Sequence, residues 1–194
     1  MSQTTLDSPR TARQRLLTAA DELFYAEGVN SVGIDRVIEH AGVAKATLYS
    51  AFGSKDGLIR AYLLHRHDRR VDRIMRHVDA VEDPRAKLLA IFDSLAELFA
   101  TVNWRGCPFL ASPGETRSGD PVDEITTLTR GWTRTLFIDL AGRAGLADPS
   151  GVADALMNVY DGAIVASQFD HNLNAATTAR RIAEVLLAAA AECR

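Results

Sequence analysis

The sequence has little that would support a covalent framework or a membrane anchor. Its 194 residues include two cysteines, Cys107 and Cys193, which lie far apart, so no disulfide framework can be read from them. Reduced thiols are the usual state in the cytoplasm. No apolar run approaches the roughly 18 residues of a membrane span, and residues 1–10 lack the apolar core of a signal peptide. We therefore expect a cytoplasmic protein that makes no contact with membranes.

The sequence also lacks the signatures of common enzyme classes. We find no glycine-rich phosphate loop, no serine elbow, no paired carboxylates in a helical cleft and no metal-ligand spacing. Asp123, Glu124 and Asp161 are isolated and are interpreted as surface or capping residues. We expect neither catalysis nor a cofactor.

Charge is unevenly distributed along the chain. The formal net charge is −3, which by itself argues against binding to nucleic acid. Residues 1–77 nevertheless carry 12 Lys and Arg against 9 Asp and Glu, whereas residues 78–194 carry 10 against 16. Only the N-terminal part can therefore present a mildly basic face, and the remainder is acidic.

Prolines and glycines divide the chain into helical segments. Prolines follow a short polar residue at the expected helix starts Ser8-Pro9, Asp83-Pro84, Asp120-Pro121 and Asp148-Pro149. A polar N-cap followed by Pro is typical of a helix start, because the cap accepts a bond from an unpaired N–H and Pro has none to leave unpaired. Apolar residues between these starts recur with helical spacing. Further helices are expected to end at Gly28 and to begin at Ser54 and near Asn174, and residues 106–121 are expected to form a loop. With no convincing strand, the sequence predicts an all-α fold.

The segment GIDRVIEHAGVAKATLYSAF, residues 33–52, carries the functional signal. It predicts a short helix over residues 34–40 and a second over residues 44–52. Gly42 between them can adopt the left-handed conformation that a tight turn requires. Leu48 and Phe52 of the second helix face inward, and its polar residues can face outward. This is a helix-turn-helix pattern, in which the second helix enters the major groove of DNA.

Residues 11–60 resemble the N-terminal domain of the tetracycline-repressor (TetR) family. The elements that carry the resemblance are the turn Gly42-Val43, the triplet Thr47-Leu48-Tyr49, Phe52, and Ser54-Lys55 leading into Leu58. The resemblance implies an N-terminal three-helix helix-turn-helix domain, residues 1–55. It also implies a larger helical effector-binding and dimerisation domain, residues 56–194. The expected activity is that of a homodimeric repressor, released from a palindromic double-stranded operator by a small apolar or amphipathic effector.

The resemblance also assigns contacts with DNA. Tyr49 and Lys55 resemble phosphate contacts, and Thr47 resembles a phosphate or base contact. Lys45 is the best candidate to reach guanine or a backbone oxygen. Further candidates are Ser50, Ala46, Arg36 and Ser31. Outside such a motif, the lysines would be ordinary solvated side chains and Tyr49 could simply cap the small core.

The long predicted helix after residue 54 is rich in Arg and His. His65 and His67 are two residues apart and point in different directions on a helix, and no Cys or carboxylate pair completes a site. No metal site is therefore expected. We interpret the charged residues as a solvated face in which Asp72 pairs with Arg69 and Arg76.

Aromatic residues of the central helices are candidates for the wall of an effector pocket, since such pockets combine apolar walls with a few polar groups. They are Phe92, Phe99, Trp104, Phe109, Trp132 and Phe137. Each could instead belong to the core. Cys107, near Arg105, could act as a thiolate sensor, but a plain small residue is the favoured interpretation.

The last two predicted helices carry apolar stripes suited to a four-helix dimer bundle of the kind that the resemblance implies. The stripe residues are Leu156, Met157, Tyr160, Ile164, Ile182, Val185 and Leu186. Periodicity cannot distinguish a dimer interface from packing within one chain. Two alternatives for function also stay open: a regulator that acts through a protein partner without a small effector, and an activator.

Overall fold

The computed structural model describes residues 11–102, 104–109 and 119–192, which form eight α-helices and no strand. The helices are α1 (Ala12–Glu27), α2 (Ile34–Ala41), α3 (Lys45–Phe52), α4 (Lys55–Asp79), α5 (Pro84–Phe99), α6 (Pro121–Arg143), α7 (Pro149–Phe169) and α8 (Ala175–Glu192). The all-α prediction is confirmed. Two sequence predictions, the helix start at Ser8-Pro9 and the reduced state of Cys193, concern residues outside the described part. No helix in the described ranges is long and apolar enough to cross a lipid bilayer.

Local sequence signals account for most helix boundaries. Asp83, Asp120 and Asp148 each accept hydrogen bonds from the first turn of α5, α6 and α7, and Pro occupies the first helical position each time. Ser54 caps α4 by accepting a bond from the backbone of the third helical residue. Helix α1 is capped by Thr11 in a capping box. Four of these five caps match helix starts predicted from the sequence. The fifth, Thr11, was not predicted as a helix start.

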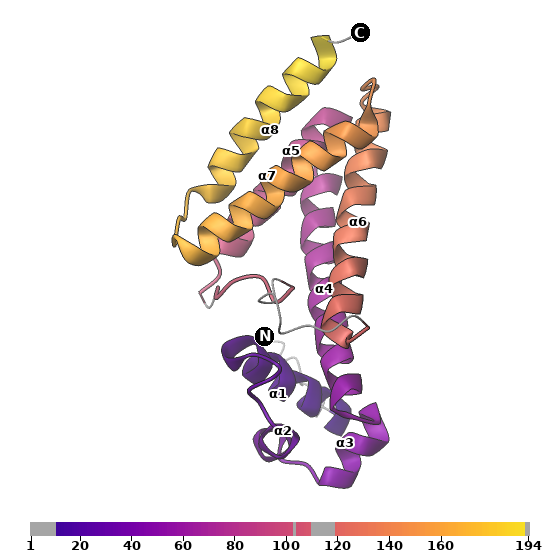
Figure 1. Cartoon of the computed structure of the whole chain (residues 1–194), viewed down its shortest axis with the longest axis vertical. Coiled ribbons are helices and arrows are strands. Elements are labelled where there is room, and N and C mark those ends of the chain that lie inside the picture. Colours follow the sequence, from indigo (N-terminus) through magenta and orange to yellow (C-terminus); the bar gives the residue numbers. More distant parts are fainter. Residues whose placement is uncertain (1–10, 103, 110–118, 193–194) are drawn as a thin grey trace, which may run out of the picture.

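The buried apolar residues form two clusters at opposite ends of an elongated molecule (Figure 1). The smaller one, called the head cluster here, joins α1, α2 and α3 to the first half of α4. It also contains three residues from later in the chain: Phe109, and Val122 and Ile125 of α6. The larger one, the body cluster, joins the second half of α4 to α5, α6, α7 and α8. Helix α4 passes through both, so the domain boundary expected at residue 55 stays a prediction.

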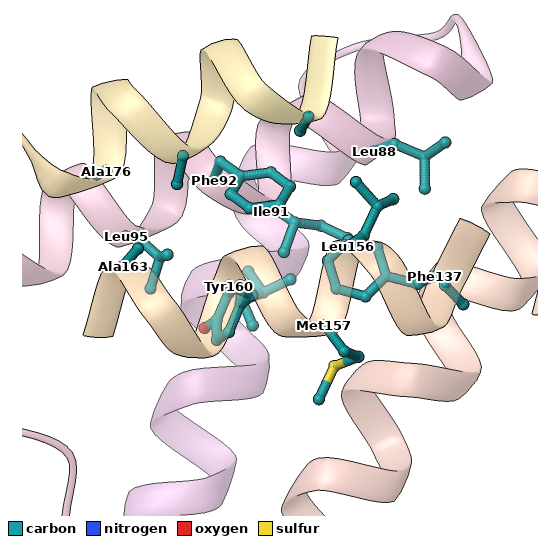
Figure 2. Packing of buried hydrophobic residues seen from close by; sticks show 14 of the residues in the cluster. Leu88, Ile91, Phe92, Leu95, Phe137, Leu156, Met157, Tyr160, Ala163 and Ala176 are labelled. Atoms are coloured by element: carbon teal, nitrogen blue, oxygen red, sulfur yellow. The ribbon is translucent and has the colours of Figure 1, made fainter. Parts of the chain in front are cut away.

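Aromatic rings occupy the middle of the body cluster, as Figure 2 shows. The ring of Phe92 from α5 lies 6.0 Å from that of Phe137 on α6 and 6.1 Å from that of Tyr160 on α7, measured between centroids. All three side chains are completely buried. Separations of this size are typical of favourable aromatic packing. These residues hold the body helices together.

The solvated face predicted for the Arg- and His-rich helix is wrong for part of α4. His67 and Arg70 are buried, with 9% and 8% of their surface exposed. Arg76 pairs with Glu97 of α5 at 2.6 Å rather than with Asp72. The physical reason is tertiary: α1, α5 and α6 all pack on α4, so little of its circumference is left in water.

Candidate DNA-binding surface and body cavity

The helix-turn-helix is built around a left-handed glycine. Gly42, with φ 60° and ψ 47°, ends α2, and its N–H and that of Val43 bond back to the last turn. Such a conformation is cheap for glycine and costly for a residue with a Cβ atom. The turn directs the chain into α3 after a single further residue, Ala44. The predicted bounds of both short helices are therefore confirmed to within one residue.

Helix α3 is fixed in place by one deeply buried side chain. Leu48 is fully buried in the head cluster, where Val37 and Ala41 of α2 are also buried. The opposite side of α3 is open: Tyr49 is 45% exposed, and Lys45, Ala46 and Ser50 are exposed as well. Thr47 is half-buried. One face of α3 is thus anchored, and the other is free to meet a ligand.

The corner between α3 and α4 depends on a second glycine. A Cβ atom at Gly57 would lie 2.0 Å from the carbonyl oxygen of Phe52, far inside van der Waals contact. Ser54 accepts a 3.0 Å hydrogen bond from the N–H of the same glycine. This close approach positions Lys55, at the first turn of α4, next to the end of α3. No sequence pattern pointed to Gly57.

Two of the cations on this surface, Lys45 and Arg36, already form ion pairs with carboxylates. Lys45 Nζ lies 2.9 Å from Asp35 of α2, and this hydrogen bond and charge raise the pKa of Lys45. Arg36 pairs with Glu27 of α1 through two hydrogen bonds, which raise the pKa of Arg36. Both pairs are exposed, so they are easily exchanged for other partners. Ser31 is exposed in the segment before α2.

Comparisons with known proteins agree with this geometry. Residues 16–62 match the family model described as bacterial regulatory proteins, tetR family. The fold matches the crystal structure of SCO4454, a TetR-family transcriptional regulator from Streptomyces coelicolor, with a TM-score of 0.84 and 31% identity over 92% of this chain and 95% of that one. The chain belongs to the TetR family of transcriptional regulators.

Curated relatives of the TetR-family chain resemble it over a shorter stretch. An uncharacterized HTH-type transcriptional regulator of Mycobacterium tuberculosis is 39% identical over 79 residues, which are 40% of this chain and 39% of the relative. The HTH-type transcriptional activator FasR of Mycolicibacterium smegmatis is 34% identical over 87 residues, 44% of this chain and 40% of the relative. These relatives are regulators rather than enzymes, as the sequence analysis expected. The matched stretch is about two fifths of each relative's length.

Helices α1, α2 and α3 are called the reading head from here on. Beside them, a cavity of about 830 Å³ opens where α1, α4, the end of α5 and residues 104–109 meet. Of the six aromatic residues predicted for an effector pocket, Trp104 and Phe109 lie in its wall. Phe92, Phe99 and Phe137 are buried in the body cluster instead. The sixth, Trp132, packs edge-on against His67, with ring centroids 6.1 Å apart.

A row of arginines, which was not predicted to line a pocket, is the most conspicuous part of this wall. Those that line the cavity are Arg66, Arg69, Arg70, Arg73, Arg76 and Arg105. Their spacing along α4, mostly three or four residues, is the helical signal that could have placed them on one face. Cys107 also lines the cavity and is half-buried, with its backbone N–H bonded to Gln168.

The stripes predicted for a dimer interface divide into two groups. Leu156, Met157, Tyr160 and Ile164 on α7 are buried within the chain's own body cluster, so they are not free to meet a second copy. This part of the prediction is corrected, because α5, α6 and α8 already cover that face of α7.

The other group faces outward. Ile182 and Val185 of α8 are 47% and 69% exposed, and Leu186 is half-buried. Val165 and Phe169 of α7 are also exposed, although the sequence analysis did not single them out. Helices α7 and α8 pack side by side (Figure 1), so two neighbouring helices of the body carry these exposed apolar residues.

Proposed function

We propose that this chain is a homodimeric transcriptional repressor that binds a palindromic operator through α3 and is released by a small-molecule effector. The observation that carries the proposal is the free face of α3, which presents Lys45, Tyr49 and Ser50 beside the Gly57 corner and Lys55. A face of this kind on the second helix of a helix-turn-helix is suited to the major groove of DNA. Binding to chromosomal DNA would take place in the cytoplasm.

Each side chain on this surface has a role that follows from its chemistry. Tyr49 and Lys55 contact phosphates, the first as a hydroxyl donor and the second as an ammonium group. Lys45 and Thr47 reach a base edge or a phosphate, and Lys45 does so by exchanging Asp35 for DNA. Weaker contacts come from Ser50, Ala46, Arg36 and Ser31, of which Arg36 must first leave Glu27.

The dimer supplies the second reading head that a palindromic site requires. Exposed apolar residues on α7 and α8 support an interface there: Val165, Phe169, Ile182 and Val185. Val185→Glu should leave a folded monomer in sedimentation experiments, because it buries a charge in the interface. Leu128→Glu on α6, which is also exposed in the single chain, is the matched control and should stay dimeric. A dimeric Val185→Glu protein would contradict this interface.

The cavity of about 830 Å³ favours a small effector over regulation by a protein partner alone. Activation is a second candidate, because the relative FasR is named an activator. Transcription in vitro from a promoter containing the selected site distinguishes the two: a repressor lowers transcript yield, and an activator raises it.

The experiment that tests the proposal is a selection of binding sites from random duplex DNA, followed by titration of the best site at two salt concentrations. We expect a palindrome and an affinity that falls steeply as salt rises. No enrichment from a folded, dimeric sample at low salt would overturn the proposal.

Lys55→Ala tests the role of that residue in the same titration. It should weaken binding to all sequences alike and lower the salt slope by about one phosphate contact per head. Arg143→Ala, at the far end of α6, also removes one exposed positive charge and should leave the slope unchanged. An unchanged slope for Lys55→Ala would contradict the assignment.

A further inference from the structure

Two arginines in the cavity wall, the buried Arg70 and the half-buried Arg73, form no close ion pair with a carboxylate among the described residues. Arg70 and Arg73 lie on one face of α4, in the middle of the row of arginines that lines the cavity. A guanidinium group is charged at every pH at which proteins fold. A buried charge costs free energy unless an opposite charge or a full set of hydrogen bonds compensates it.

Arg70 is the more deeply buried of the two, with 8% of its surface exposed. One terminal nitrogen donates a 3.2 Å hydrogen bond to the hydroxyl of Thr133, and the guanidinium lies 5.0 Å from the centre of the Tyr160 ring. Its Nε has no hydrogen-bond partner. A hydroxyl and an aromatic face compensate only part of a full positive charge, so Arg70 keeps unused capacity to bind an anion.

Arg73 is one helical turn along α4. Its Nε donates a 3.1 Å hydrogen bond to the carbonyl oxygen of Ser94. Burial lowers the pKa of Arg73, and the charge of Arg70 lowers this pKa further, while Tyr160 and Glu97 act in the opposite direction. Two positive charges are thus held close together, and the hydrogen bonds described here go from them to neutral groups, a hydroxyl and a carbonyl oxygen.

Three of the four carboxylates of the cavity wall already have partners, and two of these partners, Arg66 and Arg76, belong to the same wall. Asp21 binds Arg66, and Glu22 lies 2.7 Å from His40. Glu97 accepts from Arg76 at 2.6 Å and from His77 at 2.8 Å, and these hydrogen bonds lower its pKa. The fourth, Asp72, is exposed. Against these four carboxylates stand six arginines, so the wall carries an excess of positive charge.

Much of the rest of the wall is apolar. Trp104, Phe109, Ile164 and Leu98 line the cavity together with the arginines. Trp104 is held in place by a 2.9 Å hydrogen bond from its indole nitrogen to the hydroxyl of Ser167. A ligand that satisfies both parts of the wall has an anionic group at one end and an apolar or aromatic body at the other.

We propose that this cavity binds an organic carboxylate with an apolar body, whose charged group pairs with Arg70 and Arg73. The anion supplies the acceptors that these two guanidinium groups lack. Its apolar body lies against Trp104 and Phe109. The further role of this anion as the effector rests on the function proposed above.

The cavity wall reaches the reading head through Tyr25 of α1. The Tyr25 hydroxyl donates to the carbonyl oxygen of Gly106 at 3.1 Å and accepts from the N–H of Arg105 at 2.9 Å. The guanidinium of Arg66 lies 3.9 Å from the centre of the Tyr25 ring. An anion that draws the arginines of α4 inward therefore acts on a helix of the DNA-binding head, and this contact couples ligand binding to operator affinity.

A structural role for Arg70 predicts a different outcome from a ligand-binding role. If the arginine stabilises the fold, its replacement by an apolar residue of similar length lowers the melting temperature. If it is kept for an anion, Arg70→Met removes an incompletely compensated buried charge, and the ligand-free protein melts at the same or a higher temperature.

The test is calorimetric titration of the full chain, without DNA, with three acids and their neutral amides: benzoate, 1-naphthoate and octanoate. In the wild type, at least one acid should bind about tenfold or more tightly than its amide, because only the acid forms charge-assisted hydrogen bonds. Arg70→Met and Arg73→Met should each lose about tenfold or more in affinity for that acid. The exposed control Arg143→Met should bind as the wild type does.

Three results would overturn the anion site: no binding of any of the three acids at millimolar concentration, equal affinity for acid and amide, or wild-type affinity in both cavity variants. Arg73→Met and the comparison of acid with amide keep the test decisive if Arg70→Met does not fold. A lower melting temperature of ligand-free Arg70→Met would show a structural role and also count against the site.

Operator release is measured separately with the acid that binds most tightly. A fall in operator affinity in the wild type, absent in Arg70→Met, supports the effector role, and an unchanged affinity overturns that role. Failure of the DNA selection would contradict the proposed function but leave the calorimetric result valid, so the two failures are distinguishable.

Discussion

The head and the body of the molecule differ in the polar residues that they bury. In α1, α2 and α3 every buried side chain is apolar. The buried polar and charged residues of the described chain all lie beyond these helices, toward the body: His67, Arg70, Ser94, Thr129, Thr133 and Ser167. An apolar core defines one packing arrangement, whereas buried polar groups require partners and can exchange them. The comparison suggests a rigid reading head and a body whose interior is adapted to a ligand.

The largest expected effect on stability comes from creating a cavity in the apolar core of the head. Leu48→Ala removes a fully buried side chain and should lower the free energy of unfolding by about 3 kcal/mol, within the usual range for such a change. Chemical denaturation followed by circular dichroism measures it. Tyr49→Ala, the neighbouring exposed residue, should change stability little but weaken DNA binding. A small effect of Leu48→Ala would mean that the head core is not tightly packed.

Two helical glycines give a second pair of opposed effects. Gly57→Ala forces a Cβ atom against the Phe52 carbonyl oxygen, so the corner must open and α3 must shift. We expect lower stability and loss of operator binding. Gly131→Ala on α6 meets no atom within 4 Å and should raise stability by about 0.5–1 kcal/mol. Thermal melting of both variants checks the signs, and equal shifts would contradict the role of Gly57.

The local parts of the fold could be predicted from the sequence. Asp83, Asp120 and Asp148 cap helices because a cap depends only on residues within three positions. The turn at Gly42 and the inward side of α3 at Leu48 follow from the same short-range logic. The family resemblance rested on this segment, and the comparisons confirm the family.

The parts that depend on tertiary contacts could not be predicted in this way. Arginine is a residue type usually found at the surface. Arg70 is buried because α6 packs on α4, and Thr133 of α6 accepts its hydrogen bond. Tyr160 and Val185 belong to similar apolar stripes, yet one is completely buried and the other is 69% exposed. An apolar stripe predicts that a helix face is buried, but it does not predict whether the same chain or a second copy buries it.

A smaller expected effect is a dependence of stability on pH that comes from a buried histidine toward the body, His67. Burial lowers the pKa of His67 below the 6.5 of a free histidine, and Arg70 lowers it further, although Asp68 raises it. As pH falls below about 6.5, the unfolded chain binds a proton at this site that the folded chain does not bind, so stability declines. His67→Gln should lose less stability between about pH 7 and pH 5.5 than the wild type does.

The control for this measurement is His171→Gln, which replaces an exposed histidine in the segment between α7 and α8. Denaturation midpoints at a series of pH values provide the comparison. If His67→Gln and the wild type lost stability in parallel, another group would be responsible for the decline.

The smallest expected effect concerns the exposed surface of the head. Asp35 holds Lys45 at 2.9 Å, and both side chains are largely in water, so the pair contributes little to stability. Beside DNA, the same carboxylate repels phosphates and competes for the lysine. Asp35→Asn should therefore tighten binding to the selected operator by about twofold to fivefold, the range expected from an exposed ion pair. Asp79→Asn, an exposed change of equal charge at the end of α4, separates this local effect from net charge and should alter affinity less. Weaker binding by Asp35→Asn would instead mean that Asp35 positions Lys45 for its contact, and that the ion pair persists on DNA.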